Sequence, residues 1–548
     1  MTPIPGMMMD RPLLVSALIE HAERFHGSVP VVARDHDGAL FRYTYAEAAR
    51  RAKRLAKALL RLGVRPGERV ATMAWNGHRH FELYYGISGI GAVMHTINPR
   101  LFEDQVAYIA NHAQDRLLFV DLSLLPLAEA LRERLTTIHT YVALAPRAAL
   151  PAGTTLPGLL SYEELLEAED DDFAWPQFDE RSACALCYTS GTTGRPRGAL
   201  YSHRSTVLHT MNCCAVDGHG VSGEDCVLPA VQMYHGNAWG IPYSATAAGA
   251  KLVLAGRQLD GETLFRLLEE ERVTFSLGVP TVWLDLLAYT APRGLRLTTL
   301  RRVVSGGSAV PQSLVEAFRR EHGVRMIQAW GMTEMNPLGA TAALRHKHLG
   351  APEAERDAVN QAQGRPPFLV DMRIVGPEGE ILPHDGRAVG ELHVRGPWVI
   401  SGYFDDPAAT AAAITADGWL ATGDVCSIDP DGYLRIVDRA KDMIKSGGEW
   451  ISSIALENAA AAHPDVAEAA AVAVPHPRWG ERPILLVVAR DGRAVDVASL
   501  LEFLGARVAR WWLPDKVLVV SELPRTATGK VSKATLRDRY RDHRLPGR

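Results

Sequence analysis

Short apolar runs alternate with segments of helical periodicity along most of this 548-residue chain. Residues 50–62 have the spacing of an amphipathic helix, and residues 69–74 have that of a buried strand. The same order returns later, with strands at 301–304 and 324–328 on either side of a helix at 311–322. Strands that alternate with helices are typical of largely parallel sheets whose faces are covered by helices. The chain is therefore predicted to be an α/β protein.

A chain of this length cannot bury its apolar residues in one core, so it must contain several folding units. The best boundary is the short charged stretch Asp438-Arg439-Ala440-Lys441-Asp442. The residues beyond it again alternate helix and strand, which is enough for a small α+β domain with its own core. We predict a large domain over residues 1–437, a hinge at 438–443 and a small domain over 444–548.

The composition excludes several classes of function. The formal net charge is −4, and no basic stripe interleaved with aromatic residues is present, so nucleic-acid binding is not expected. No apolar stretch of about 18 residues spans a membrane, and the first residues have no signal-peptide pattern. Six cysteines form no disulfide framework in so long a chain. A cytoplasmic location is expected.

Residues 188–198, YTSGTTGRPRG, combine four Ser or Thr hydroxyls with three glycines directly after the apolar run 183–187. A strand that leads into such a loop directs backbone N–H groups and hydroxyls at one point, which suits a phosphate chain. A Walker-type loop is excluded, because Gly194 is followed by Arg195-Pro196-Arg197 rather than by Lys-Ser or Lys-Thr. The segment is predicted to be a phosphate loop of another kind.

Five further segments are candidate ligand-binding segments when they are considered together with this loop. Two of them, 305–309 and 328–334, follow predicted strands, where open α/β sheets bind ligands. The others are the turn 422–424 with its carboxylate, the Lys- and Gly-containing stretch 441–448, and the loop 524–530 with its terminal lysine. Each alone is a weak signal, because short motifs match by chance. Their presence together in this order is specific.

With these motifs the chain resembles the adenylate-forming enzymes, which include acyl-CoA synthetases, luciferases and peptide-synthetase adenylation domains. The resemblance runs from about residue 13 to residue 537, and its motifs are YTSGTTGRPRG (188–198), SGGSAVP (305–311), WGMTE (330–334), GELHVRGPWVISGY (390–403), TGD (422–424), DRAKDMIKSGGEWIS (438–452) and PRTATGK (524–530). Within the family, residues 95–100, 234–239 and 445–453 look most like bacterial medium- and long-chain fatty-acyl-CoA synthetases. The amino-terminal third also looks like 3-methylmercaptopropionate–CoA ligases.

The resemblance implies a fold and a reaction. It implies a large domain of stacked mixed sheets with helices, and a small carboxyl-terminal α+β domain that moves between two half-reactions. A carboxylate attacks the α-phosphorus of Mg·ATP, and CoA then displaces AMP from the acyl-adenylate. The co-substrates and cofactor are thus ATP, CoA and Mg²⁺. Both steps need alignment and charge stabilisation more than an acid–base pair.

Site residues follow from the resemblance by position. The catalytic residues are expected to be Lys530, Thr333 and Glu334, and the metal ligands Thr189 and Glu334. The nucleotide- and phosphate-binding residues are expected to be Thr189, Ser190, Gly191, Thr192, Thr193, Gly194, Arg197, Gly236, Gly307, Gln328, Ala329, Trp330, Asp424, Arg439, Lys441, Lys445 and Trp450. The acyl pocket is expected to contain Tyr234, His235, Trp239, Val279, Ser305, Gly306 and Met332.

Individual roles are equally specific. Asp424 is expected to bind the ribose, Lys441 to act first as the hinge, and Lys530 to bridge the carboxylate and the α-phosphate. Two residues depart from the family pattern. Arg197 stands where a lysine is usual, which keeps the charge but changes its geometry. Trp330 stands where a tyrosine is usual, which keeps stacking but loses the hydrogen bond of the phenol.

Several alternatives remain open at this level. A medium- or long-chain fatty acid fits an apolar pocket of small residues, and so does 3-methylmercaptopropionate. The acyl group could be loaded onto a carrier protein instead of CoA, although no carrier domain is attached. A non-catalytic nucleotide-binding protein would not require Lys530 and Glu334, and both are present. The resemblance further implies a homodimer.

Overall fold

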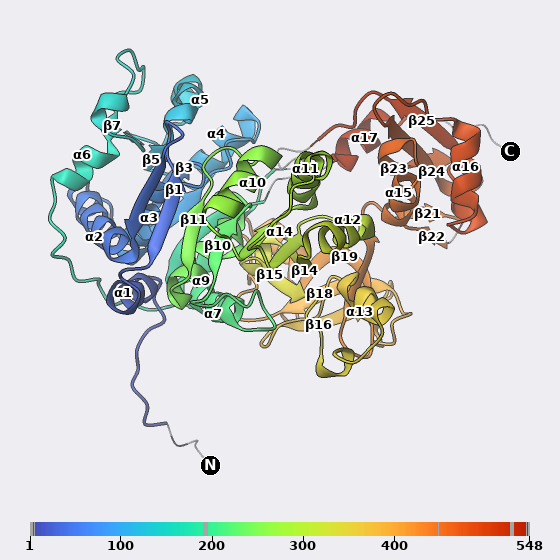
Figure 1. The fold of residues 1–548 in the computed structure, drawn as a ribbon, viewed down its shortest axis with the longest axis horizontal. Helices are drawn as coiled ribbons and strands as arrows, with labels where there is room; N and C mark the ends of the chain where they lie inside the picture. Colours follow the sequence, from blue (N-terminus) through green and yellow to red (C-terminus); the bar gives the residue numbers. More distant parts are fainter. Residues whose placement is uncertain are drawn as a thin grey trace.

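The computed structural model describes residues 4, 6–189, 195–447, 449–525, 531–543 and 545. Within these ranges the chain is an α/β protein with four sheets, as the alternation of segments predicts. Two large sheets and a smaller third sheet form one body, and a separate lobe follows at the carboxyl-terminal end (Figure 1). We refer to β21–β25 with α15–α17 as the carboxyl-terminal lobe.

The largest sheet is parallel except at its two edges, where β2 and β15 run antiparallel to their neighbours. Its order is β15 (Leu338–Thr341), β14 (Arg325–Gly331), β13 (Arg302–Gly306), β12 (Phe275–Gly278), β10 (Cys226–Pro229), β11 (Lys251–Leu254), β1 (Pro30–Arg34) and β2 (Leu40–Thr44). The parallel register places the ends of β12, β13 and β14 side by side, with Gly278 opposite Ser305 and Gly306 opposite Ala329. Segments that follow these strands therefore meet at one edge.

The second sheet is parallel except for β9, which returns antiparallel to β8 after the phosphate loop. Its order is β7 (Leu160–Ser161), β6 (Thr140–Ala143), β5 (Leu117–Val120), β3 (Arg69–Met73), β4 (Val93–Thr96), β8 (Ala183–Tyr188) and β9 (Gly198–Ser202). The strand predicted before the loop is thus β8.

Helices cover both large sheets (Figure 1). The α-helices that the structure describes before the carboxyl-terminal lobe are α1 (Ser16–Phe25), α2 (Tyr45–Arg61), α3 (His78–Gly89), α4 (Glu103–His112), α5 (Leu125–Leu131), α6 (Tyr162–Glu167), α7 (His203–Cys214), α8 (Gly236–Trp239), α9 (Ile241–Ala248), α10 (Gly261–Glu270), α11 (Pro280–Thr290), α12 (Gln312–Ala317), α13 (Glu353–Asn360) and α14 (Pro407–Ala413). The largest buried cluster joins α1, α2, α3 and α9 to strands of both sheets. Of the helices that the structure describes, none is long and apolar enough to cross a membrane.

Helix α2 begins five residues before the predicted segment 50–62. The Thr44 hydroxyl accepts the Glu47 backbone N–H, and the Glu47 carboxylate accepts the N–H of Thr44. This capping box satisfies two N–H groups that the first turn leaves free. The predicted segment omits this first turn, although Tyr45 and Ala48 in it are buried. The polar segment 345–363 contains α13.

The third sheet is antiparallel throughout and leads to the carboxyl-terminal lobe. Its order is β17 (Ile381–Leu382), β16 (Asp371–Val375), β18 (Gly390–Arg395), β19 (Leu420–Ile428) and β20 (Leu434–Arg439). The lobe contains β21 (Ile444–Ser446), β22 (Glu449–Ile451), β23 (Val466–His476), β24 (Gly480–Ala489), β25 (Lys516–Val520), α15 (Ser453–Ala461), α16 (Val497–Gly505) and α17 (Lys533–Arg539). The hinge predicted at 438–443 spans the end of β20 and the turn before β21, and it stays a prediction.

A buried charged cluster fixes α15 against α17 within the lobe. The Lys533 ammonium lies 2.8 Å from the Glu457 carboxylate and donates to the Ser453 hydroxyl at 2.6 Å. The Asp438 carboxylate accepts the backbone N–H and the hydroxyl of Ser453, each at 2.6 Å. Burial raises the pKa of Glu457 to about 7, against the attraction of Lys533. Two carboxylates therefore attract one ammonium at a largely buried position beside the cavity.

This cluster gives a prediction for the pH dependence of stability. Because the folded pKa of Glu457 lies above its ordinary value of 4.5, folding favours the protonated form, and this contribution is lost as pH rises towards 7. Glu457→Gln removes the group that titrates. We expect the melting temperature of the variant, relative to the unmodified chain, to rise between pH 5 and pH 8, by the equivalent of about 2 kcal/mol.

The measurement is a thermal unfolding series at half-unit steps of pH on both chains. Glu502→Gln, which changes an exposed carboxylate on α16, serves as the matched control and should give the same difference at every pH. A Glu457→Gln difference that stays flat from pH 5 to pH 8 would contradict the prediction.

Candidate active site

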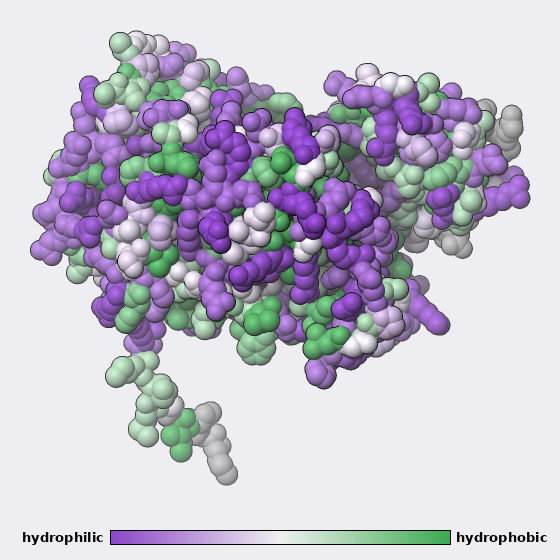
Figure 2. Space-filling view, viewed as in Figure 1, coloured by the Kyte–Doolittle hydropathy of each residue, from purple (hydrophilic) through white to green (hydrophobic). Residues whose placement is uncertain are grey.

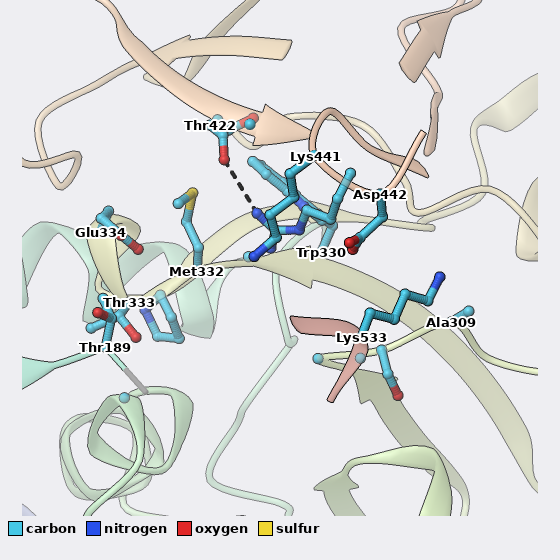
Figure 3. Close-up of a pocket in the computed structure, with 18 of the residues that line it drawn as sticks. Thr189, Ala309, Trp330, Met332, Thr333, Glu334, Thr422, Lys441, Asp442 and Lys533 are labelled. Carbon is cyan, nitrogen blue, oxygen red and sulfur yellow. Dashed lines mark hydrogen bonds between the residues drawn. The ribbon is translucent and has the colours of Figure 1, made fainter. Parts of the chain in front are cut away.

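A cavity of about 970 Å³ lies where the ends of β13 and β14 face the third sheet and the carboxyl-terminal lobe. Figure 2 shows the hollow between the large body and this lobe. In Figure 3, Thr189, Thr333 and Glu334 lie together on one side of the cavity, whereas Asp442 and Lys533 lie on the other. Residues far apart in the sequence thus line one space.

Thr189 and Arg197 form the base of the predicted phosphate loop. The Thr189 backbone N–H donates to the Arg197 carbonyl at 2.9 Å, and the Arg197 N–H donates to the Thr189 hydroxyl at 3.2 Å. Both residues line the cavity. The loop is therefore closed at its base, with the charge of the Arg197 side chain beside the opening. Residues 190–194 lie outside the described residues.

Glu334 provides the buried negative charge of the site. It lies in the short turn Thr333–Met335 after β14, and only 7% of its surface is exposed. The Tyr403 hydroxyl donates to one of its carboxylate oxygens at 2.8 Å. The guanidinium of Arg197 lies over the Tyr403 ring, 5.3 Å from its centroid. Burial raises the pKa of Glu334, while Tyr403, Arg439 and Arg197 oppose the rise.

Asp424 is buried behind the cavity wall, and its carboxylate is held by side chains from two different strands. The Trp330 indole N–H on β14 donates to one carboxylate oxygen at 2.9 Å. The Arg439 guanidinium, opposite Asp424 in the β19–β20 register, lies 2.8 Å from the other oxygen. Arg439 also donates to the Thr422 carbonyl at 3.2 Å, the dashed line in Figure 3. The substitution of tryptophan for tyrosine at position 330 thus supplies a hydrogen bond of its own.

The apolar side of the cavity requires glycine at two positions. A Cβ on Gly306 would lie 2.4 Å from the Ala329 carbonyl oxygen, and Gly307 has a φ of +79° with the Val279 side chain 3.3 Å from its Cβ position. Trp239 lies beside both glycines. A side chain at Gly306 would therefore collide with the backbone, and one at Gly307 would require a strained backbone conformation.

Trp239 is placed by a turn of unusual handedness. Gly236, Asn237, Ala238 and Trp239 all have φ between 47° and 55°, so α8 is a left-handed turn. This conformation costs non-glycine residues roughly 1–2 kcal/mol each. The buried Asn237 side chain helps to hold it, because its oxygen accepts from the Tyr84 hydroxyl at 3.4 Å and from the Cys187 thiol at 3.4 Å. Strain of this kind persists only where the surroundings fix it.

The structure brings most of the predicted site residues together. Those that line the cavity are Thr189, Arg197, His235, Gly236, Trp239, Val279, Gly306, Gly307, Ala329, Trp330, Met332, Thr333, Glu334, Arg439 and Lys441. Partial burial and neighbouring cations lower the pKa of Lys441, although Asp442 opposes this shift. Ser190, Gly191, Thr192, Thr193, Gly194 and Lys530 lie outside the described residues.

Other predicted residues do not line this cavity. Gln328 and Ser305 are buried within their strands, and Tyr234 packs edge-on against Trp75 in an apolar cluster. Lys445 and Trp450 are exposed on the lobe, where the Lys445 ammonium lies over the Trp450 ring at 4.7 Å. Asp424 meets the cavity only through its partners Trp330 and Arg439.

Several residues that line the cavity were not predicted from the sequence. Tyr403 ends the predicted motif 390–403, so its motif could have indicated it. Glu457 and Lys533 come from the lobe, and Lys533 lies three residues beyond the predicted catalytic lysine. His219 lies in a turn with no motif of its own. Only the three-dimensional arrangement places it at the cavity.

Comparison with known proteins agrees with this geometry. Residues 18–404 match the model of the AMP-binding enzyme, and residues 455–530 match that of the AMP-binding enzyme C-terminal domain. The chain is 50% identical over 537 residues to the 3-methylmercaptopropionyl-CoA ligase of Ruegeria lacuscaerulensis, which covers 98% of this chain and 99% of the relative. It is 47% identical over 539 residues to the medium-chain-fatty-acid–CoA ligase of Ectopseudomonas oleovorans, which covers 98% of each.

A solved structure gives the same fold. The ATP-bound MatB of Rhodopseudomonas palustris superposes with a TM-score of 0.82 at 26% identity. The match covers 97% of this chain and 99% of that one. It therefore includes both the large body and the carboxyl-terminal lobe.

Proposed function

Because this chain belongs to the AMP-binding enzyme family, we infer that it is an ATP-dependent carboxylic acid–CoA ligase that works through an acyl-adenylate. Relatives at 47–50% identity over nearly the whole chain are acid–CoA ligases by name. The observation that carries the proposal is a single cavity. It joins the loop base at Thr189 and Arg197, the buried Glu334 and the apolar side at Trp239. Such a cavity suits a phosphate chain at one end and an acyl chain at the other.

In the first half-reaction, a carboxylate oxygen of the acid attacks the α-phosphorus of ATP. A C–O–P bond forms, and pyrophosphate leaves with the electron pair of the bond that breaks. Arg197 lies where it can stabilise the charge of the leaving phosphates. Lys530 is proposed to bridge the carboxylate and the α-phosphate, and Thr333 to hold a phosphate oxygen. Alignment and fixed charge supply most of the rate in a reaction of this kind.

The residues at the cavity fit Mg²⁺. This ion takes few carboxylates and leaves its other positions to phosphate and water. Glu334 is a single buried carboxylate at the cavity, and the Thr189 hydroxyl lies at the loop base. When bound, the ion supplies positive charge beside the phosphates. We propose Thr189 and Glu334 as the residues that hold it.

The nucleotide is proposed to lie against β13 and β14. Gly307, Ala329 and Trp330 would surround the adenine, because they line the cavity at adjacent strand ends. Asp424 and Arg439 would hold the ribose, with the Asp424 carboxylate oriented by the indole N–H of Trp330. A buried carboxylate with fixed donors is a specific acceptor for hydroxyl groups.

In the second half-reaction, the CoA sulfur attacks the acyl carbon, the bond to the phosphate oxygen breaks, and AMP leaves with its electron pair. The thiol proton passes to water. We propose that the carboxyl-terminal lobe turns about Lys441 between the two steps, so that Lys530 leaves the site. A turn of this kind needs only a few linker residues to change their dihedral angles. Lys445 and Trp450 are exposed on the lobe. We propose that they contact the nucleotide in one of the two positions of the lobe.

The acid is proposed to be a medium- to long-chain fatty acid, bound along Trp239, Val279 and Gly306. The medium-chain ligase relative supports this choice. The 3-methylmercaptopropionyl-CoA ligase relative supports 3-methylmercaptopropionate as the alternative. Transfer of the acyl group to a carrier protein remains the other candidate.

A homodimer and a cytoplasmic location are proposed on the family resemblance alone, and light scattering on the eluted protein would test the dimer.

The test of the function is AMP release with ATP, Mg²⁺ and CoA over acids from acetate to palmitate, with 3-methylmercaptopropionate included. A maximum at medium or long chains supports the fatty-acyl ligase. A maximum at the thioether acid supports the alternative. Acyl-adenylate formation without transfer to CoA would favour a carrier protein, and AMP release from no acid would contradict the proposal.

Glu334→Gln is expected to lower AMP release with the best acid about 100-fold or more, because it removes the negative charge at the proposed metal position but keeps the shape. ATP binding without Mg²⁺, measured by calorimetry, should change little. Glu391→Gln, which changes a more exposed carboxylate that also lines the cavity, is the matched control and should stay within a few-fold of the unmodified chain. An unchanged rate of AMP release in Glu334→Gln would contradict the proposal that Glu334 holds the metal ion.

Trp330→Phe is expected to raise the KM for ATP about tenfold, because Asp424 loses a hydrogen bond to a charged group while the aromatic surface remains. The kcat should fall less. Trp398→Phe is the matched control, since Trp398 is also buried, does not line the cavity and donates its indole N–H to the backbone carbonyl of Leu338 rather than to Asp424. Steady-state kinetics decide the point: equal KM values in the two variants would contradict a nucleotide role for Trp330.

A further inference from the structure

His219 is a buried polar residue of the cavity to which the proposed reaction gives no role. It lies in the turn that follows α7, it is 3% exposed, and it lines the same cavity as Trp239 and Gly306. Its Nδ1 atom is buried without a hydrogen-bond partner. The only ring contact of His219 in the described residues is with Phe275, at 6.4 Å between centroids.

The turn at His219 is held at the opposite end of β13 from Gly306. Arg302, the first residue of β13, donates to the Gly220 carbonyl at 2.8 Å and pairs with the Asp225 carboxylate at 2.9 Å. Gly306 is the last residue of the same strand. Four residues of strand span roughly 13 Å. Gly306 and His219 both line the cavity, which therefore extends from the reacting end at Gly306 to His219.

The chemistry at this far end differs from that of an ordinary acyl tunnel. Burial, together with the charge of Arg302, lowers the pKa of His219 to about 4. The imidazole is therefore neutral near pH 7, with one N–H donor and one nitrogen acceptor. A polar group in an apolar pocket costs free energy when a ligand removes its water without replacing the hydrogen bond. The terminal methyl group of a fatty acid would remove water from His219 without replacing its hydrogen bond.

We propose that His219 is a specificity-determining residue that forms a hydrogen bond with a hydroxyl or oxo group at the far end of a medium-chain acid. An extended chain advances about 1.2 Å per bond, as the peptide backbone does at about 3.6 Å per residue. The length of β13, roughly 13 Å, less a hydrogen bond of about 3 Å, therefore corresponds to an acid of about eight or nine carbons. A short thioether acid held at Gly306 does not reach this residue. The inference rests on the proposed acid–CoA ligase function and names the substrate class of that site.

The test compares matched acids that differ only at the far end: octanoate with 8-hydroxyoctanoate, and decanoate with 10-hydroxydecanoate. The kcat/KM for AMP release is measured on the unmodified chain and on His219→Phe, which keeps a planar ring beside Phe275. The ratio of kcat/KM for the hydroxy acid to kcat/KM for the plain acid is expected to fall about tenfold in the variant. The hydroxy acid loses its hydrogen bond, and the plain acid no longer buries an unpaired ring nitrogen. Activity on butanoate should not change.

Two further variants separate specificity from structure. His219→Gln keeps a donor and an acceptor and should recover most of the original ratio. His78→Phe replaces another buried histidine with an unpartnered ring nitrogen, stacked on Phe41 and absent from the cavity lining, and should leave the ratio unchanged. If His219→Phe lowers both members of each pair equally, or leaves the ratio as it was, the specificity role is overturned.

A binding measurement keeps this test independent of the proposed function. Calorimetry of octanoate and 8-hydroxyoctanoate requires no turnover, so it reports on His219 even where no acid releases AMP. Tighter binding of the hydroxy acid that is lost in His219→Phe supports the inference. Equal binding of the two acids by the unmodified chain overturns it, whereas absent AMP release from every acid contradicts the ligase proposal instead.

Discussion

The buried carboxylate of Asp424 holds the architecture of the site together. Its two oxygens accept from Trp330 on the largest sheet and from Arg439 at the end of the third sheet. A buried charge is costly unless donors surround it, so these elements are fixed relative to each other by the need to satisfy one side chain. Arg439 is also the last residue before the turn to the carboxyl-terminal lobe. The position from which the lobe departs therefore depends on the same contact.

The acyl side depends on a different constraint, which is backbone geometry. The left-handed turn at α8 places Trp239 against Gly306 and Gly307, where a Cβ atom would collide or be strained. Such a turn is unfavourable for three of its four residues. It persists because the side-chain oxygen of the buried Asn237 accepts two hydrogen bonds and because the neighbouring strand ends are fixed by the parallel register. Rigid strands thus support a strained segment at the cavity, as functional sites often require.

The sequence predicts the parallel architecture well, because alternating apolar runs and helices leave few other arrangements. Motifs also indicate Thr189, Glu334 and Trp239, whose neighbours in the sequence are unusual in composition. Contacts between distant segments are less accessible. The indole bond to Asp424 joins residues 94 positions apart, and no local pattern contains it. His219 shows the same limit, since its position depends on how Arg302 holds a turn that is remote in sequence.

The contacts of the Arg197 side chain explain why an arginine suits this position. Its guanidinium lies over the Tyr403 ring, and the Tyr403 hydroxyl donates to Glu334. A planar guanidinium stacks on an aromatic ring and keeps its charge under desolvation more readily than a lysine ammonium does. The tyrosine therefore couples the cation of the loop base to the buried carboxylate without direct neutralisation of either. Arg197 remains available to an anion in the cavity, and Glu334 remains available to a cation, which is the arrangement that transfer of an adenylyl group from ATP to a carboxylate requires.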